Sequence, residues 1–485
     1  MSHTIEMHEE FRCSRSPIDV FTYITDFSRI DEWDQTISSA QKRSPGAITL
    51  GTQFSLIYTL GPKRIPIEYE ITKFEPNHSA VLVGKAKNFT ATDTIRITPM
   101  EQGCHVSWQA VVQFTGASSS FAPLVKKKII TSGRQTIRNL ANALEDNYPL
   151  PRLSILKSIA DTLVIPGVAT FTKYGYTFSK KNWNPVTNNV QGQHMVITGA
   201  TSGLGLVTAY ALAHRGATLT LVARDKLKAE SVKSEIVKQT GNGNINLEIA
   251  DLSEIGQTID LAKRLNSSGT PIDVLINNAG ALLNRRLENS EGIETSFSLL
   301  LLSPVILTEL LKPLLGKRNV SRVINVSSGG MYAKGIELDN LESTQGSYSG
   351  AAAYARSKRG LVLAGQYWAK HWSKDSIIVH NMHPGWAQTP GVEKSLPEFN
   401  KKMQRTLRTP EQGADTIIWL ACASEVVKKS GLFWLDRQPH SIHLTKRTQE
   451  SAATRQQLFI KLREYGDRFS VKLELGDESR GEIDD

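Results

Sequence analysis

The sequence predicts two domains: an α/β domain with a doubly wound parallel sheet and, ahead of it, a smaller α+β domain. Three observations lead to this fold class. From residue 191 onward, short apolar strands alternate with helical segments, as in a parallel sheet with crossover helices. Before residue 150, apolar and polar residues alternate, as in antiparallel strands. A chain of 485 residues is also long for one domain, since domains usually contain about 150 residues.

The composition is that of a soluble globular protein, with 40% apolar and 21% charged residues. The net charge of +10 fits three kinds of anionic partner: a nucleic acid, a membrane surface or a phosphate-bearing cofactor. Because no element combines clustered Lys and Arg with interleaved aromatic residues, we expect no nucleic acid partner.

The cysteines and the N-terminus indicate a cytoplasmic protein. Cys13, Cys104 and Cys422 are odd in number and far apart, and none belongs to a Cys-x-x-Cys pair. This argues against a disulfide framework or a metal site. The first residues are polar and acidic, unlike a signal peptide, and no run of 18 apolar residues predicts a membrane span.

Residues 1–148 form the first predicted domain. A strand comes first, then a helix that begins after Ser16 with Pro17 at its first position. A long amphipathic helix over about 121–146 closes the domain. Between the helices, Gly, Pro and Asn turn signals separate strands expected at 53–60, 65–76, 79–100 and 103–116.

This order of elements, together with the stretch DVFTYITDFSRIDEWD, resembles the helix-grip fold of the START/polyketide-cyclase superfamily. The resemblance implies a sheet that curls around the last helix, with an apolar cavity between them. Such a cavity would hold a lipid or another hydrophobic molecule. A structural module with a filled core is the alternative.

Residues 149–190 are expected to connect the domains. Their first part is moderately apolar but broken by Pro166 and Gly167, and the stretch TKYGYTFSKKNWNP is basic and aromatic. Two interpretations stay open: a helix packed between the domains, or a peripheral contact with a membrane interface through Lys and aromatic anchors.

Residues 191–470 form the second predicted domain, and the acidic residues 471–485 are expected to be disordered. Crossover helices are expected at 204–216, 226–240 and 259–266. The predicted strands are 194–200, 217–224, 245–253, 271–280, 321–328 and 376–385.

The stretch TGATSGLG, residues 198–205, follows the first of these strands and opens a helix. Glycines there permit a tight turn and a close backbone approach to a pyrophosphate, which the helix N-terminus would bind. The context predicts a Rossmann-like dinucleotide site. Arg224 ends the next strand, where an acidic residue would bind the ribose hydroxyls of NAD, so we expect its guanidinium to pair with the 2′-phosphate of NADP(H). Asp225 follows directly and leaves NAD(H) open.

Tyr354 and Lys358 share one helix face in YARSK, a spacing that is common by chance. Here it follows ADLS, NNAG and NVSS and precedes HPG. In this order and context, the motifs resemble the fingerprint of the short-chain dehydrogenase/reductase family over about residues 191–440.

The resemblance implies a catalytic set of Ser328, Tyr354 and Lys358, with Ser328 chosen over Ser327. In the family these residues transfer a proton while hydride passes between a nicotinamide and a carbonyl or alcohol. A free tyrosine has a pKa near 10, and a neighbouring ammonium is expected to lower it. The serine hydroxyl would polarise the carbonyl. The cofactor residues implied by the resemblance are Gly199, Ser202, Gly203, Leu204, Arg224, Asp251, Leu252, Asn278, Ala279, Gly280, Tyr354, Lys358, Pro384, Gly385 and Thr389.

One position departs from the family. Its members usually have an asparagine on the helix after Asn-Asn-Ala-Gly, where it holds a water of a proton relay behind the lysine. In this chain Leu300 takes that place, and Ser303 and Pro304 follow. Leucine cannot bind a water, and proline removes a helical hydrogen bond. Either activity is reduced, or the relay is built otherwise, or NADP(H) is bound without turnover.

The main hypothesis is therefore an NADP(H)-dependent oxidoreductase for a hydrophobic small molecule, with a lipid in the N-terminal cavity. A sensor or carrier that binds NADP(H) without turnover is the alternative. His380 and His383 are expected to be packed strand-end histidines rather than cofactor ligands, and Trp386 is expected near the substrate mouth. The family resemblance also makes a homodimer an open expectation.

Overall fold

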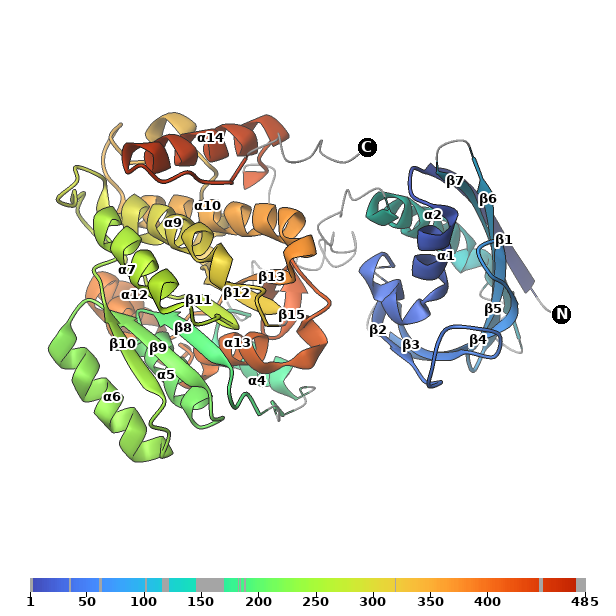
Figure 1. Ribbon diagram of the computed structural model, residues 1–485, viewed down its shortest axis with the longest axis horizontal. Coiled ribbons are helices and arrows are strands. Elements are labelled where there is room, and N and C mark those ends of the chain that lie inside the picture. Colours follow the sequence, from blue (N-terminus) through green and yellow to red (C-terminus); the bar gives the residue numbers. More distant parts are fainter. Residues whose placement is uncertain are drawn as a thin grey trace. The chain divides into compact units, whose positions relative to one another are not determined.

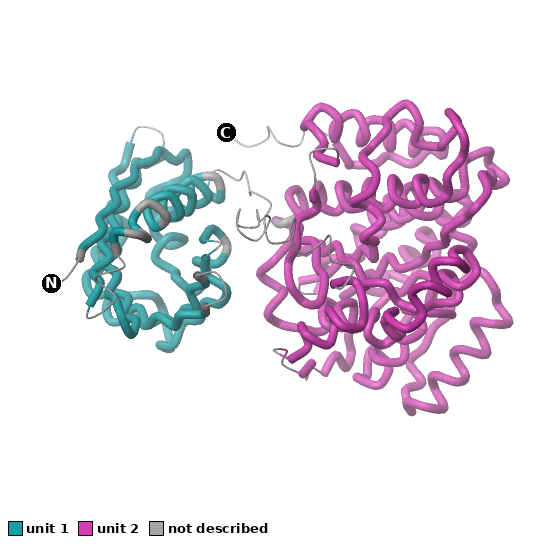
Figure 2. Tube along the Cα trace, turned by 180° about the vertical axis from the view of Figure 1, so that it is seen from behind, with its two compact units in different colours: residues 1–156 teal, residues 157–485 magenta. Residues whose placement is uncertain are grey.

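The computed structural model describes residues 3–476, with gaps at 35, 61–62, 101–102, 116–121, 145–169, 182, 184, 187–188, 319 and 445–447. The chain forms two compact units, residues 1–156 and 157–485 (Figure 2). The first half of the expected connector and the last nine residues of the expected tail lie outside the described residues.

The first unit is a seven-stranded antiparallel sheet in the order β1-β7-β6-β5-β4-β3-β2. Its helices lie on the concave face of the sheet (Figure 1). They are α1 (Pro17–Thr25), η1 (Phe27–Glu32) and α2 (Ala122–Leu144). The strands are β1 (His3–Cys13), β2 (Ile37–Lys42), β3 (Gln53–Leu60), β4 (Lys63–Glu75), β5 (Ser79–Lys85), β6 (Phe89–Pro99) and β7 (Cys104–Phe114).

This element order confirms the predicted helix-grip fold. The Ser16 side chain accepts from the Asp19 backbone and caps α1, as expected. The single strand predicted over 79–100 is wrong, because the chain reverses between β5 and β6, where the Ala86 N–H donates to the Phe89 carbonyl. Apolar alternation continues on both sides of the turn, so the period alone does not reveal the reversal.

Five aromatic rings fill the centre of this unit. The Phe27 ring centroid lies 5.1–6.4 Å from those of Trp33, Phe54, Tyr69 and Trp108. All five side chains are almost completely buried. Aromatic side chains contribute much of the energy of a core because each buries a large apolar area. This part of the interior is therefore packed with side chains.

One carboxyl group lies in this aromatic interior. Asp93 occupies an inward position of β6, where its oxygens accept from Tyr69 Oη (3.0 Å) and Trp108 Nε1 (2.9 Å). Burial raises the pKa of Asp93 to about 6, although both hydrogen bonds oppose the shift. The hydrogen bonds compensate part of the desolvation cost of the carboxyl group.

The second unit contains an eight-stranded sheet in the order β10-β9-β8-β11-β12-β13-β14-β15, parallel except for β15. This confirms the predicted doubly wound α/β fold. The strands are β8 (His194–Thr198), β9 (Thr218–Ala223), β10 (Ile245–Ile249), β11 (Val274–Asn277), β12 (Ser321–Val326), β13 (Ile377–Met382), β14 (Phe433–Leu435) and β15 (Gln438–His440).

Helices cover both faces of this sheet (Figure 1). One face is covered by α5 (Gly203–Ala213), α6 (Lys226–Thr240) and α13 (Pro410–Cys422), the other by α7 (Ile255–Ser268), α9 (Ser303–Leu310) and α10 (Gly350–His371). The remaining helices are α4 (Lys173–Lys180), α8 (Thr295–Phe297), α11 (Pro390–Ser395), α12 (Pro397–Met403) and α14 (Ala452–Arg468), with short turns η3 (Ser298–Leu302), η4 (Lys312–Leu314), η5 (Gly329–Tyr332), η6 (Leu338–Asn340), η7 (Ser373–Asp375) and η8 (Ser424–Val426).

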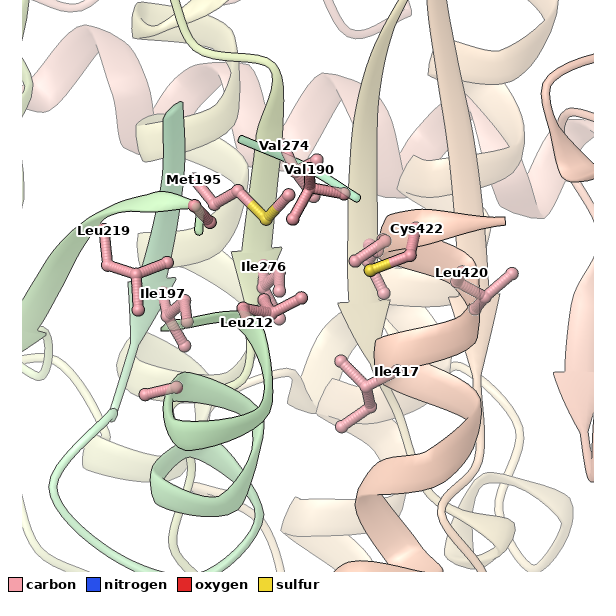
Figure 3. Close-up of a cluster of buried hydrophobic side chains, with 14 of the residues drawn as sticks. Val190, Met195, Ile197, Leu212, Leu219, Val274, Ile276, Ile417, Leu420 and Cys422 are labelled. Atoms are coloured by element: carbon pink, nitrogen blue, oxygen red, sulfur yellow. The ribbon is translucent and has the colours of Figure 1, made fainter. Parts of the chain in front are cut away.

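Buried aliphatic side chains join the sheet to its first helical layer. Figure 3 shows Ile197 of β8 and Ile276 of β11 beside Leu212 of α5, and Ile417 of α13 belongs to the same cluster. Each fully buried side chain of this kind contributes roughly 1.5–3 kcal/mol. This packing fixes the strand ends that carry the motifs.

Two segments expected to lie outside the second domain pack on it. Phe171 and Tyr176, from the second half of the expected connector, are buried. The start of the expected disordered tail is also packed: Val471, Leu473 and Leu475 are 6%, 3% and 0% exposed. The prediction of disorder is wrong for residues 471–476, because their alternating apolar side chains are buried against the second unit, and this burial stabilises an ordered conformation. Within the described residues, no helix is both long and apolar enough to cross a membrane.

Candidate active site

The glycine-rich turn joins β8 to α5. Gly199 has a φ of 65°, and a β-carbon there would lie 2.9 Å from the Ala279 Cα, so only glycine fits. Ser202 is the N-cap of α5, yet among the described residues its side chain makes no capping hydrogen bond. The first turn of the helix, which begins at Gly203, therefore has uncapped N–H groups for a phosphate. The Leu204 side chain packs against the core beside Gly413.

The NNAG stretch at the end of β11 is tied to this turn. Asn278 Nδ2 donates to the carbonyls of Thr198 (2.9 Å) and Gly199 (3.3 Å). The backbone N–H groups of Asn278 and Ala279 donate to Thr198 Oγ1 at 2.9 and 3.0 Å. Because these bonds join two neighbouring strand ends, the turn and the NNAG stretch form one rigid edge.

Arg224 follows β9, the neighbour of β8 in the sheet. Its side chain is exposed, directly after β9. The neighbouring Asp225 is the N-cap of α6, where its carboxylate accepts from the Lys228 N–H at 3.0 Å. Asp251 caps its own turn by accepting from Ser253, and Leu252 beside it is almost buried. Both carboxylates are thus engaged in local caps, whereas the Arg224 side chain is exposed.

The loop after β13 approaches the glycine-rich turn from the other side of the strand edge. It contains Pro384 and Gly385 and leads to Thr389, the N-cap of α11. The Thr389 methyl group lies 3.3 Å from where a β-carbon of Gly203 would stand. The loop therefore meets the glycine-rich turn, and the two segments enclose the strand edge from both sides.

Ser328 and Tyr354 are brought together at this edge. Ser328 Oγ and Tyr354 Cδ1 lie 3.5 and 3.8 Å from where a β-carbon of Gly330 would stand, and Ser328 Oγ accepts from the Gly330 N–H at 3.1 Å. Ser327 points elsewhere, because its buried hydroxyl donates to the Lys358 carbonyl at 3.1 Å. Ser328 rather than Ser327 is thus the serine beside the tyrosine.

Burial raises the pKa of Tyr354, and the Ser328 hydrogen bond lowers it by less. The sequence led us to expect the opposite direction, a pKa lowered by Lys358. Lys358 Nζ instead donates to the Val326 carbonyl at 2.7 Å. Burial lowers the pKa of Lys358 to about 8, so its ammonium is itself easily lost.

Leu300 stands where the family's asparagine is expected, and it is fully buried. Its Cδ2 lies 3.0 Å, and Lys358 Nζ 3.6 Å, from where a β-carbon of Gly280 would stand. Leu300 belongs to a π-helical turn, η3, and Pro304 follows at the start of α9. Residues 295–310 form one continuous helical run, in which the Ser303 N–H donates to the Ser298 carbonyl five residues back, and Pro304, which has no N–H, directly follows this π-helical turn. An apolar side chain therefore fills the space behind the lysine.

Sequence reasoning missed a buried asparagine ladder across three strands. Asn277 of β11 donates to Asn325 of β12 (2.9 Å), and Asn325 donates to Asn381 of β13 (3.0 Å). Thr308 of α9 accepts the second proton of the Asn277 amide. The signal was an asparagine near the end of each strand, and the ladder fixes the spacing of the strand ends.

The two histidines near the end of β13 are buried. His380 Nδ1 accepts from Trp434 Nε1 at 3.2 Å, and burial lowers the pKa of His380 to about 3. His383 Nδ1 accepts from the Gly329 N–H at 3.0 Å, directly after Ser328. Burial holds the pKa of His383 well below its ordinary value. Neutral His383 thus joins the loops that follow β12 and β13.

Comparison with known proteins agrees with this geometry. A family model described as short chain dehydrogenase matches residues 193–399, and one described as Polyketide cyclase / dehydrase and lipid transport matches residues 4–145. With the relatives described next, these matches show that the chain belongs to the short-chain dehydrogenase/reductase family. Members of this family bind a nicotinamide cofactor, which the turn, strand ends and loop described above fit.

Among the relatives is Dehydrogenase/reductase SDR family member 12 from Bos taurus, 39% identical over 307 residues. The match covers 62% of this chain and 96% of that relative. The human protein of the same name is 38% identical, with 61% of this chain and 94% of that protein covered. Human Retinol dehydrogenase 13 is 30% identical, with 52% and 78% covered.

Proposed function

We propose that the second unit is an NADP(H)-dependent oxidoreductase that interconverts a carbonyl and an alcohol group of a hydrophobic small molecule. The observation that carries this proposal is that the Ser328 hydroxyl and the Tyr354 ring lie together around Gly330, at the same strand edge as the glycine-rich turn. Lys358 lies one helical turn further along α10. The similarity to retinol dehydrogenases favours an apolar substrate.

The chain's own residues would manage the proton. When bound, the nicotinamide supplies or accepts the hydride. In the reducing direction, the Ser328 hydroxyl binds the carbonyl oxygen and polarises it, and Tyr354 gives its proton to the alkoxide. The Lys358 ammonium, freed from the Val326 carbonyl, stabilises the phenolate that remains. The proton returns to Tyr354 from solvent.

The first test is NADPH oxidation by the full-length protein with a panel of aldehydes, ketones and retinoids. We expect turnover with an apolar carbonyl compound, and Tyr354→Phe should abolish it while leaving NADPH affinity unchanged. Tight NADPH binding without oxidation of any compound would defeat the oxidoreductase proposal.

The second candidate is an NADP(H)-binding sensor or carrier without turnover. Leu300 favours it, because a buried leucine beside Lys358 cannot hold a relay water. Under this alternative, the same NADPH titration shows binding and no oxidation.

Arg224 supports NADP(H) over NAD(H). Its guanidinium is exposed at the end of β9, while the carboxylate of Asp225 is engaged at the start of α6. The Asp225 carboxylate, which could otherwise bind both ribose hydroxyls of NAD(H), therefore caps α6. The Arg224 guanidinium is left to pair with the 2′-phosphate of NADP(H).

For the first unit we propose binding of a hydrophobic ligand. The matching family model names lipid transport in its description. The inward side chains of β7 are buried at Trp108 but become partly exposed at Ala110, Val112 and Phe114. Apolar surface is therefore accessible at this end of the sheet. Mass spectrometry of the molecules that co-purify with the full chain is the test, and protein free of any lipid would contradict it.

We also propose a peripheral membrane contact through α4. Tyr174 and Phe178 lie one turn apart and are 60% and 74% exposed. Lys180 and Lys181 are exposed beside them, and α4 contains no acidic residue. Aromatic and lysine side chains in this arrangement suit an anionic lipid surface. Flotation with phosphatidylserine vesicles should fall for Phe178→Ser and stay unchanged for Leu227→Ser, which removes an equally exposed apolar side chain from α6.

A further inference from the structure

A short segment that precedes the parallel sheet in sequence is held inside the second unit by Arg408. This guanidinium is 1% exposed. Its Nε donates to the carbonyls of Phe171 (3.1 Å) and Thr172 (3.2 Å), and Nη2 donates to Thr170 (2.8 Å). The buried carboxylate of Asp436 accepts from both Nη atoms, at 2.6 and 2.8 Å. Three consecutive carbonyls are thus fixed by one charge-assisted network.

The network places the Phe171 ring among other aromatic side chains. The ring stands at 82° to the His383 ring with centroids 4.6 Å apart, and its centroid lies 5.6 Å from that of Trp386. The Trp386 N–H donates to the Phe171 carbonyl at 2.7 Å. Phe399 of α12 continues the row, 5.2 Å from Trp386. Trp386 and Phe399 are only partly buried, so the row reaches the surface.

The inner end of this row lies against the residue that follows Ser328. A β-carbon at Gly329 would stand 2.7 Å from His383 Nε2 and 3.2 Å from Phe171 Cε2, so these two rings take the space of a side chain. The Gly329 N–H is held by His383 Nδ1. The rings of His383 and Phe171 therefore pack against the Ser328 loop, and Trp386 continues this row of rings toward the surface.

We propose that Phe171 is a specificity-determining residue of the reductase site. Its ring and that of Trp386 form an aromatic wall beside Ser328, and the wall selects carbonyl compounds whose apolar chain is flat, conjugated or ring-bearing. Stacking on flat π-systems favours such chains over flexible aliphatic ones. This inference rests on the oxidoreductase proposal for its substrate oxygen, which Ser328 binds. The wall itself comes from a segment outside the parallel sheet, fastened by Arg408.

A residue that served only to pack the fold would behave differently. Its loss would weaken the protein and affect all substrates alike. A wall residue changes the affinity for a conjugated substrate and leaves a short aliphatic one unaffected. The comparison of two aldehydes in the same variant therefore separates the two roles.

The experiment uses the full-length protein with NADP+, so that an aldehyde binds without being reduced. All-trans-retinaldehyde and hexanal are titrated separately, and tryptophan fluorescence reports binding. Phe171→Leu keeps apolar bulk and removes the ring, Phe171→Tyr keeps the ring, and Phe469→Leu, at the C-terminal end of α14, is the matched control. KM and kcat with NADPH are measured for the same set.

We expect Phe171→Leu to raise the dissociation constant and the KM for retinaldehyde roughly three- to tenfold, and to leave hexanal within about twofold. Phe171→Tyr should keep the wild-type values, and Phe469→Leu should not change them. An equal effect on both aldehydes, no effect on either, or a wild-type complex that binds no retinaldehyde overturns the inference. If Phe171→Leu fails to fold, Trp386→Leu must weaken retinaldehyde binding and leave hexanal binding unchanged. If Trp386→Leu does not show this difference, the inference fails. Retinaldehyde binding without NADPH oxidation would instead defeat the oxidoreductase proposal alone.

Discussion

Lys358 and Leu300 both lie beside Gly280, and this arrangement shapes the chemistry that the site can perform. The lysine has lost most of its hydration, and the side chain behind it is apolar. Its proton is therefore held less firmly than that of a lysine in water. The tyrosine that it should assist is buried as well, which raises the pKa of Tyr354.

The pKa of Lys358, about 8, predicts a pH dependence. The ammonium form is present below this pKa and is lost as the pH rises through it. We expect kcat/KM for carbonyl reduction to fall above about pH 8. Lys358→Arg keeps its charge to higher pH and should remove that decline, at lower activity. A pH–rate profile with NADPH and an apolar aldehyde checks this, and an unchanged rate from pH 7 to well above 8 would contradict it.

Replacing Leu300 by asparagine tests whether the missing relay limits turnover. Leu300→Asn places an amide beside Lys358, where it can bind a water. We expect kcat to rise about tenfold, a modest share of what a positioned proton-transfer group contributes. Leu300→Ala is the control, because it opens space without an amide. A gain with alanine equal to that with asparagine would show that space, not the amide, matters.

Arg224→Ala tests the choice of cofactor. Loss of a charge-assisted pair with the 2′-phosphate should raise the dissociation constant of NADPH roughly 10- to 100-fold. NADH lacks that phosphate, so its affinity should stay the same. Fluorescence titration with both cofactors measures the difference, and an equal loss for the two would refute the role of Arg224.

At the scale of the elements, an alternating apolar pattern does not reveal where a strand ends and the chain turns back, or where one inward position is polar. The hairpin of β5 and β6 continues one alternating pattern, and β6 places the carboxyl group of Asp93 at an inward position where the pattern is otherwise apolar. Tyr69 reaches Asp93 from β4 and Trp108 reaches it from β7, on either side in the sheet. A polar contact of this kind depends on strand order, which local sequence does not specify.

The raised pKa of Asp93 makes the first unit sensitive to pH. The folded state holds the proton with a pKa of about 6, against 3.8 for an unperturbed carboxyl, so protonation favours folding. This stabilisation is complete at pH values below 3.8, the pKa of the unperturbed carboxyl, and it is lost as the pH rises through about 6. Its full size is on the order of 3 kcal/mol.

Asp93→Asn should remove that part of the pH dependence. Urea unfolding at pH 4.5 and pH 7.5, followed by proteolysis and mass spectrometry of peptides from residues 3–144, measures the first unit within the full chain. We expect the stability difference between the two pH values to be smaller in Asp93→Asn than in the wild type. The same difference in both proteins would show that the carboxyl group does not titrate as described.

For the whole molecule, the agreement between sequence and structure is closest where local signals are strong. The Gly-rich turn, the alternation of strands and helices and the Ser16 cap each act over a few residues, and all are found as expected. The disorder expected for residues 471–476 failed because the buried surface that receives Val471, Leu473 and Leu475 comes from distant elements. Cys13 and Cys104, far apart in sequence, are directly opposite each other in β1 and β7.

By itself, the sequence determined the fold of both units, the family and the positions of its motif residues, because these depend on periodicity and on short motifs. Only the tertiary structure decided which groups touch. It placed Ser328 rather than Ser327 at Tyr354, set Leu300 beside Lys358, and brought Phe171 from ahead of the sheet to the Ser328 loop through Arg408. Such contacts join residues up to about half the chain apart, and no local pattern encodes a distance of that kind.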